Sequence, residues 1–160
     1  MAEVVKFVVD ASKLNGVLRI ALIGSLTTDK ADPKDADLLV TVDDDANLAS
    51  LAKLSRRIQG RAQSIGRGGE VFLSDADHAY IGRVCPWREC GAGIRMSCDA
   101  LNCGRRPYLH DDLATIQLDE VLVRELPVEL WPEVKTKRAV PSDLEEEVLA
   151  QLRGNKSAKG

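Results

Sequence analysis

The sequence predicts one α+β domain, an α/β layer in which helices pack on one face of a mixed β-sheet. Three observations predict this fold. The chain has 160 residues, which is room for a single domain of ordinary size. Hydrophobic residues make up 44% and charged residues 29%, which is the balance of a folded globular chain. Helix-spaced and strand-like apolar segments alternate in the order α–β–turn–β–α–β.

The first elements follow from apolar spacing. Residues 2–14 carry apolar side chains at helical spacing until Asn15-Gly16, so a helix is predicted there. Residues 17–23 form a short run rich in branched apolar side chains, which predicts a buried strand. A short helical turn is expected over 26–32, and a second buried strand over 36–42.

The later elements complete the layer. A helix is predicted from about 46 to 63, with an N-cap offered by the three aspartates 43–45. Residues 71–73 predict a third strand and 113–130 a mostly extended segment. A short helix over 141–152 would begin at Ser142 as its N-cap.

These elements predict a division of the chain into four parts. The predicted parts are a core over 1–80, a cysteine-bearing segment over 81–110, strands and a helix over 111–153 that complete the same domain, and a disordered tail over 154–160.

Charge and hydropathy narrow the classes of function. The net charge of −3 and a pI near 5.5 argue against a protein that coats DNA with a basic surface. No apolar run approaches the ~20 residues of a membrane span, so no membrane partner is expected. The first residues do not have the basic-then-apolar pattern of a secretory signal, so a cytoplasmic location is expected.

The most informative pattern is a pair of acids after a Gly-Ser turn. The predicted strand 17–23 is followed by Gly24-Ser25, and Asp35-Ala36-Asp37 opens the next strand. Two acids at i and i+2 of a strand share a face, where their charges repel unless a cation lies between them. Carboxylates suit Mg²⁺, and a tight turn with free N–H groups and a hydroxyl suits a terminal phosphate.

The stretch ALIGSLTTDKADPKDADLLV, within residues 21–40, resembles the nucleotidyltransferase superfamily of DNA polymerase β type, especially its minimal prokaryotic members. The resemblance covers about residues 3–75. In that family a third acid comes from the following strand, and the matching position is Glu70, with Asp75 as second choice.

The resemblance implies a Mg²⁺-dependent transfer of a nucleoside monophosphate from an NTP to an acceptor hydroxyl by a two-metal mechanism. It implies that Asp35 and Asp37 ligate both ions and that Glu70 ligates the first ion and helps deprotonate the acceptor. The β- or γ-phosphate would contact Ser25, beside Gly24, and Lys30 or Lys34 would neutralise the triphosphate. A protein, a small molecule and an RNA end stay open as acceptors.

Four cysteines lie within nineteen residues, in the pattern Cys85-x4-Cys90-x7-Cys98-x4-Cys103. Reduced thiols clustered in this way predict a structural Zn²⁺ site. A variant in which His110 or His78 replaces Cys85 as a ligand stays open, as does a redox pair.

Five arginines and two aromatic residues lie within this segment, a composition that would suit a nucleic-acid or nucleotide acceptor. A solvated basic loop that pairs with the acidic C-terminal helix stays open equally. The alternative to an enzyme is therefore a catalytically inactive zinc protein of the same fold that binds nucleic acid or protein, for example as an antitoxin does.

Overall fold

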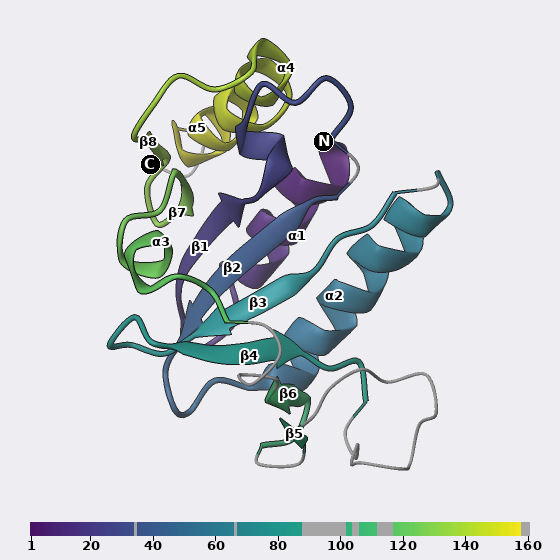
Figure 1. Cartoon of the computed structure of the whole chain (residues 1–160), viewed down its shortest axis with the longest axis vertical. Coiled ribbons are helices and arrows are strands. Elements are labelled where there is room, and N and C mark those ends of the chain that lie inside the picture. The colour runs from purple at the N-terminus through teal and green to yellow at the C-terminus, as the bar shows by residue number, and fades with distance from the viewer. Residues whose placement is uncertain (34, 66, 88–101, 104–105, 112–116, 158–160) are drawn as a thin grey trace.

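The computed structural model describes residues 1–33, 35–65, 67–87, 102–103, 106–111 and 117–157. In this part of the chain one mixed sheet of eight strands runs in the order β5-β6-β4-β3-β2-β1-β7-β8 (Figure 1). The strands are β1 Val17–Ile23, β2 Asp37–Val42, β3 Val71–Ser74, β4 Tyr80–Val84, β5 Asn102–Cys103, β6 Leu109–Asp111, β7 Val128–Trp131 and β8 Lys135–Thr136. The predicted α+β class is confirmed.

The centre of the sheet combines both strand directions. Strand β1 is antiparallel to β2 and to β7, and β2 is parallel to β3. The parallel pair requires a crossover, which helix α2 (Leu48–Gln63) provides. The two predicted strands at 17–23 and 36–42 are confirmed as β1 and β2, and most of their residues are buried.

The main core lies between the sheet and the helices on one of its faces. Helix α1 (Ala2–Ala11) and α2 bury their apolar stripes against alternate residues of the strands, such as Ile20, Leu22 and Val40. Full burial of each such side chain stabilises the fold by about 1.5–3 kcal/mol. The C-terminal helical segment joins the same core through Leu144, Val148, Leu149 and Leu152.

That C-terminal segment is longer than predicted. It comprises α4 (Ser142–Leu144), a π-helical turn η2 (Glu145–Leu149) and α5 (Ala150–Ser157), so the first four residues of the predicted tail 154–160 are helical. The N-cap position is Pro141, with no side-chain cap, and the prediction of Ser142 as cap is wrong.

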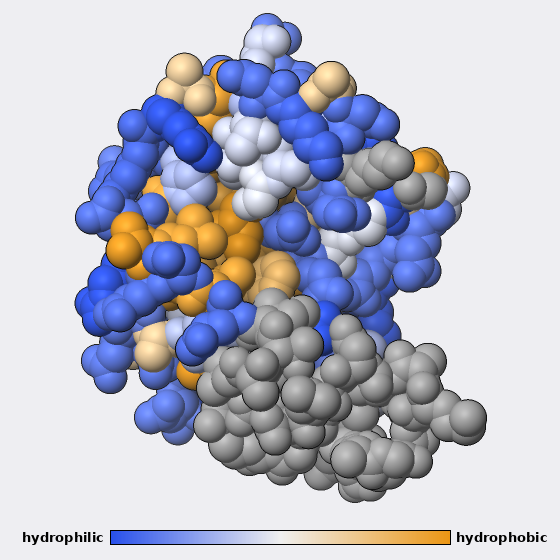
Figure 2. Space-filling view, in the orientation of Figure 1, coloured by the Kyte–Doolittle hydropathy of each residue, from blue (hydrophilic) through white to orange (hydrophobic). Residues whose placement is uncertain are grey.

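The opposite face of the sheet has a smaller cover. Helix α3 (Glu120–Arg124) packs there through Val123, which with Leu126 joins Ala21, Ile23 and Leu39 in a second apolar cluster. Figure 2 shows apolar surface gathered over this side of the molecule. Helices therefore lie on both faces, and the prediction that they pack on one face only is wrong. The extended structure predicted over 113–130 is also wrong at α3, where Asp119 caps a helix.

Two further local differences have simple causes. The cap of α2 is Asn47, whose side chain accepts a hydrogen bond from the Ala49 N–H at 3.0 Å, rather than one of the aspartates 43–45. The turn predicted over 26–32 is the 3-10 helix η1 (Ser25–Thr27), which begins directly after Gly24.

None of the helices in the described ranges combines the length and the apolar character that a bilayer-spanning segment requires.

Candidate functional site

The Gly-Ser turn and the paired acids meet at one end of the sheet. Strand β1 ends at Ile23, which pairs with Asp37 at the start of β2. Gly24 and Ser25, the next residues of the chain, therefore lie beside Asp37 although twelve residues separate them in sequence. The sequence pattern of turn and acids thus forms one local group in space.

Backbone pairing brings the segment before β3 to the same place. Asp35 forms an isolated parallel bridge with Gly68, and the Leu38 N–H donates to the Glu70 carbonyl at 2.9 Å. Parallel neighbours in register point to the same face, so Asp37 and Glu70 are adjacent on one side of the sheet. The three predicted acids are brought together.

Asp75, the second choice for the third acid, lies elsewhere. It follows the other end of β3, and its Oδ1 accepts from the N–H groups of Asp77 and Ala79, both at 2.9 Å. This carboxylate closes a turn, so the third acid of the group is Glu70.

Two glycines leave room for the carboxylates. A Cβ on Gly24 would lie 2.8 Å from Asp37 Oδ2, and one on Gly68 would lie 2.5 Å from Asp35 Oδ1. The Gly68 N–H also donates to Asp35 Oδ1 at 3.1 Å, which orients that side chain. The present positions of both carboxylates depend on the absence of a side chain at these glycines.

The surroundings of the three acids disfavour the negative charge of Asp37. Burial raises the pKa of Asp37, and the neighbouring carboxylates of Asp35 and Glu70 raise it further, while a backbone hydrogen bond at Glu70 opposes the rise. A cation between the acids would reverse this penalty. The donor set, oxygen only, is the one that Mg²⁺ prefers.

Glu70 also has a close partner in Arg83, which was not predicted from the sequence. Arg83 of β4 donates through Nη1 to Glu70 Oε1 at 3.1 Å and to Oε2 at 3.0 Å. Arg83 is only 8% exposed, so its charge is largely shielded from water. Within the described residues, no group of three or more His, Cys, Asp or Glu side chains is placed to hold one metal ion.

The acids line an open cleft. This cleft measures about 430 Å³ and lies between the last turns of α2 and the starts of β2 and β3; its lining residues are Asp35, Asp37, Gln59, Gln63, Gly68, Gly69 and Glu70. A second cavity of about 340 Å³ shares Asp35 and Gly68 with it. That cavity is lined by apolar side chains, among them Leu26 and Ile58, and by Arg61 and Arg67.

The predicted phosphate-binding residues are placed in part. Ser25 is half-buried at the start of η1, and in the described structure its hydroxyl has no hydrogen-bond partner. Lys30 is exposed on the loop between η1 and β2. Lys34 lies outside the described residues.

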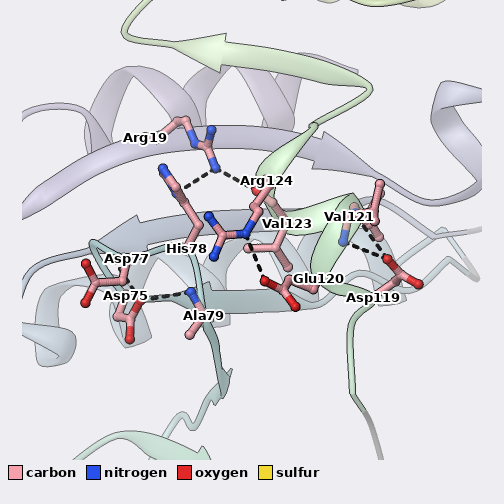
Figure 3. A network of polar contacts seen from close by, with 11 residues as sticks. Arg19, Asp75, Asp77, His78, Ala79, Asp119, Glu120, Val121, Val123 and Arg124 are labelled. Carbon is pink, nitrogen blue, oxygen red and sulfur yellow. Dashed lines mark hydrogen bonds and ion pairs between the residues drawn. The ribbon is translucent and has the colours of Figure 1, made fainter.

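Another polar group, around His78, has a structural role. Arg19 Nη2 donates to His78 Nδ1 at 3.1 Å and to the Val123 carbonyl at 2.7 Å (Figure 3). The contacts join β1, the turn after β3 and α3. Since Nδ1 accepts, the proton of the neutral imidazole is on Nε2.

The cysteine site is described only in part, because Cys90 and Cys98 lie outside the described residues. Cys85 is buried just after β4, and its N–H donates to the Tyr108 carbonyl at 2.7 Å. Cys103 pairs in β5 with His110 of β6, which pairs with Arg83 of β4. Backbone pairing thus places Cys85, just after β4, and Cys103 of β5 on opposite sides of β6. His78 precedes β4, at the end opposite Cys85; the variant in which it replaces Cys85 would involve Cys90 and Cys98, which lie outside the described residues.

The sequence did not single out two residues of this site. Gly68 could have been found from the Gly68-Gly69 pair before Glu70, a signal of close backbone approach. Arg83 gave no signal, because its strand was not predicted. No family model, curated protein or solved structure compared with the chain matches it.

Proposed function

We propose that the chain is a divalent-cation-dependent nucleotidyltransferase of DNA polymerase β type, which transfers a nucleoside monophosphate from an NTP to an acceptor hydroxyl. The observation that carries the proposal is that Asp35, Asp37 and Glu70 line one cleft and that Gly24-Ser25 follow the strand end paired with Asp37. Four sequence features that were proposed on spacing alone are neighbours in space.

In this proposal Asp35 and Asp37 hold the cation. The ion would neutralise phosphate charge and orient the reacting phosphate for displacement. Gly24 and Gly68 keep the approach to both carboxylates open, and the raised pKa of Asp37 reflects a charge that is costly until a cation arrives. The Ser25 hydroxyl is available to donate to a terminal phosphate oxygen.

The rest of the substrate has room beside the acids. The cavity of about 340 Å³ that shares Asp35 with the cleft offers apolar surface together with Arg61 and Arg67. The same lining includes the acids Glu3, Asp35 and Asp143, so it suits a molecule with an apolar body and polar groups. A protein, a small molecule and an RNA end stay as proposed acceptors. The arginine-bearing cysteine segment begins close by, because Arg83, two residues before Cys85, contacts Glu70.

One observation favours the alternative, a catalytically inactive binding module of this fold. Glu70 is engaged by Arg83, whereas a catalytic carboxylate would be needed at the ion or at the acceptor hydroxyl. Structural zinc on the four cysteines stays a prediction in both proposals.

The test compares ligand-induced stabilisation of three proteins. Thermal unfolding is followed with and without ATP and Mg²⁺ for the wild type, Asp37→Asn and the control Asp44→Asn, which changes an exposed aspartate in the loop after β2. Ligand at about 100 times its Kd should stabilise the wild type and the control by about 2.7 kcal/mol. Asp37→Asn should lose this gain.

A second measurement separates the two proposals. Pyrophosphate release and transfer of label from α-³²P-NTPs are measured with RNA ends, hydroxyl-bearing small molecules and protein fractions. Transfer that requires Asp37 supports the enzyme, and stabilisation without transfer supports the binding module. If no NTP stabilises the wild type with Mg²⁺ or Mn²⁺, the enzyme proposal is wrong, and the binding module, which requires no NTP, is favoured.

A further inference from the structure

Glu70 and Arg83 form an ion pair at the wall of the acidic cleft. Arg83 Nη1 lies 3.1 Å from Oε1 and 3.0 Å from Oε2, so both carboxylate oxygens face the guanidinium group. The Glu70 side chain is 42% exposed and that of Arg83 only 9%, so the guanidinium group is the buried partner of the pair. The pair belongs to the fold rather than to the surface.

The position of the pair follows from strand register. Phe72 of β3 pairs with Arg83 of β4, and Glu70 precedes Phe72 by two residues on the same face. A buried guanidinium cannot lose its proton, so it needs a nearby negative charge. Glu70 supplies such a charge and faces the guanidinium group with both carboxylate oxygens. The fold therefore holds Glu70 toward Arg83.

Among the described residues, no arginine or lysine pairs with the other two acids. Asp35 accepts from the backbone N–H of Gly68, and a Cβ on Gly24 would lie 2.8 Å from Asp37 Oδ2. An ion between Asp35 and Asp37 would find two carboxylates. A second ion would need Glu70, whose charge is already balanced. The described residues thus fit one cation and do not fit two.

We infer that the cleft is a one-cation site, in which Arg83 neutralises Glu70 and supplies the fixed positive charge that a second metal ion would otherwise bring. This inference rests on the proposed function. It makes Arg83 a positioning residue: the arginine acts through Glu70, and it sets the number of ions that the cleft accepts.

The test counts bound Mn²⁺ from the loss of the free-ion EPR signal. Each protein is titrated in the presence of one equivalent of α,β-methylene-ATP, an analogue that is not cleaved at the transferred phosphate. The variants are Glu70→Gln, Arg83→Gln and Asp37→Asn. Glu133→Gln is the control, since it removes an exposed glutamate that is also ion-paired, to Lys135.

We expect about one bound ion per complex in the wild type, in Glu70→Gln and in Glu133→Gln, because Glu70 is not a ligand. Arg83→Gln should release Glu70 and raise the count to about two. Asp37→Asn should weaken binding by at least the roughly 10–100-fold that loss of an outer-shell partner costs.

Two bound ions in the wild type, falling to one in Glu70→Gln, would overturn the inference and leave the proposed function intact. Since the wild-type count needs no variant, two bound ions there contradict the inference even where Glu70→Gln or Arg83→Gln fails to fold. If the analogue and Mn²⁺ bind no better to the wild type than to Asp37→Asn, the inference and the proposed function fail together.

Discussion

Gly24 is where the backbone and the acidic cleft are most tightly linked. Its φ of 76° and ψ of −156° lie in a region that only glycine adopts readily, and another residue there costs about 1–3 kcal/mol. In Gly24→Ala the new Cβ would also lie 2.8 Å from Asp37 Oδ2. We therefore expect the variant to lose both stability and cation binding.

The matched control is the same change at Gly60. This glycine is exposed within α2, and a Cβ there would meet nothing within 4 Å. Gly60→Ala should stabilise the helix by roughly 0.5–1 kcal/mol. The two variants should therefore differ by about 1.5–4 kcal/mol in free energy of unfolding, with opposite signs relative to wild type.

The assay is urea unfolding followed by circular dichroism, repeated with ATP and Mg²⁺. For a chain of this size each kcal/mol should also move the Tm by about 2–4 °C. A Gly24→Ala protein as stable as the wild type would refute the backbone argument. One that keeps the full ATP–Mg²⁺ stabilisation would refute the argument that the missing side chain opens the cleft.

Three other predictions follow from the same structure. Without divalent ions, Asp37→Asn should be more stable than the wild type at pH 7, because burial and neighbouring carboxylates raise the pKa of Asp37. Unfolding from pH 3 to 8 should show this gain shrinking as pH falls through the raised pKa and vanishing below about 3.9. Thr41 Oγ1 and Ser74 Oγ are buried and 2.9 Å apart, so Thr41→Val should lower the free energy of unfolding by about 1–3 kcal/mol because Ser74 loses its partner. In a double-mutant cycle, adding Ser74→Ala should recover part of that loss. Strictly additive costs would contradict this prediction. Elemental analysis should find zinc in the purified protein, and a chelator should lower its Tm; a Tm that responds to oxidant but not to chelator would favour a redox pair of cysteines.

The sequence predicted the parts of the fold that depend on local pattern. Strands β1 and β2 are short branched runs buried on both faces, and such runs carry a strong local signal. Strand β4 was missed because Gly82 and Arg83 interrupt its apolar pattern. Gly82 has a φ of 135°, and a Cβ there would lie 2.0 Å from the His110 carbonyl oxygen. A glycine is therefore required by the close approach of β6, which is distant in sequence.

The candidate site divides in the same way. Gly24, Asp35 and Asp37 could be grouped from sequence because a turn and a strand start bring them together within fourteen residues. The choice of Glu70 over Asp75 as the third acid depends on how β3 is aligned with β2, and amino-acid composition does not reveal this register. Predicting the ion pair with Arg83 would have required the knowledge that β4 lies beside β3, and no local sequence pattern indicates this pairing.

The pairing of β1 with β7 has a consequence for any attempt to isolate the acidic cleft. All its carboxylates lie within the first 80 residues, the predicted core segment. Yet β1 lies inside the sheet only because Val128–Trp131 covers it, as the pairing of Leu22 with Val128 records. A fragment that ends at residue 80 would present β1 as a long apolar edge with open N–H and C=O groups, the kind of surface on which chains stack and aggregate. The residues of the cleft lie within the first 80 residues, but the strand that covers the edge of β1 comes from far outside them.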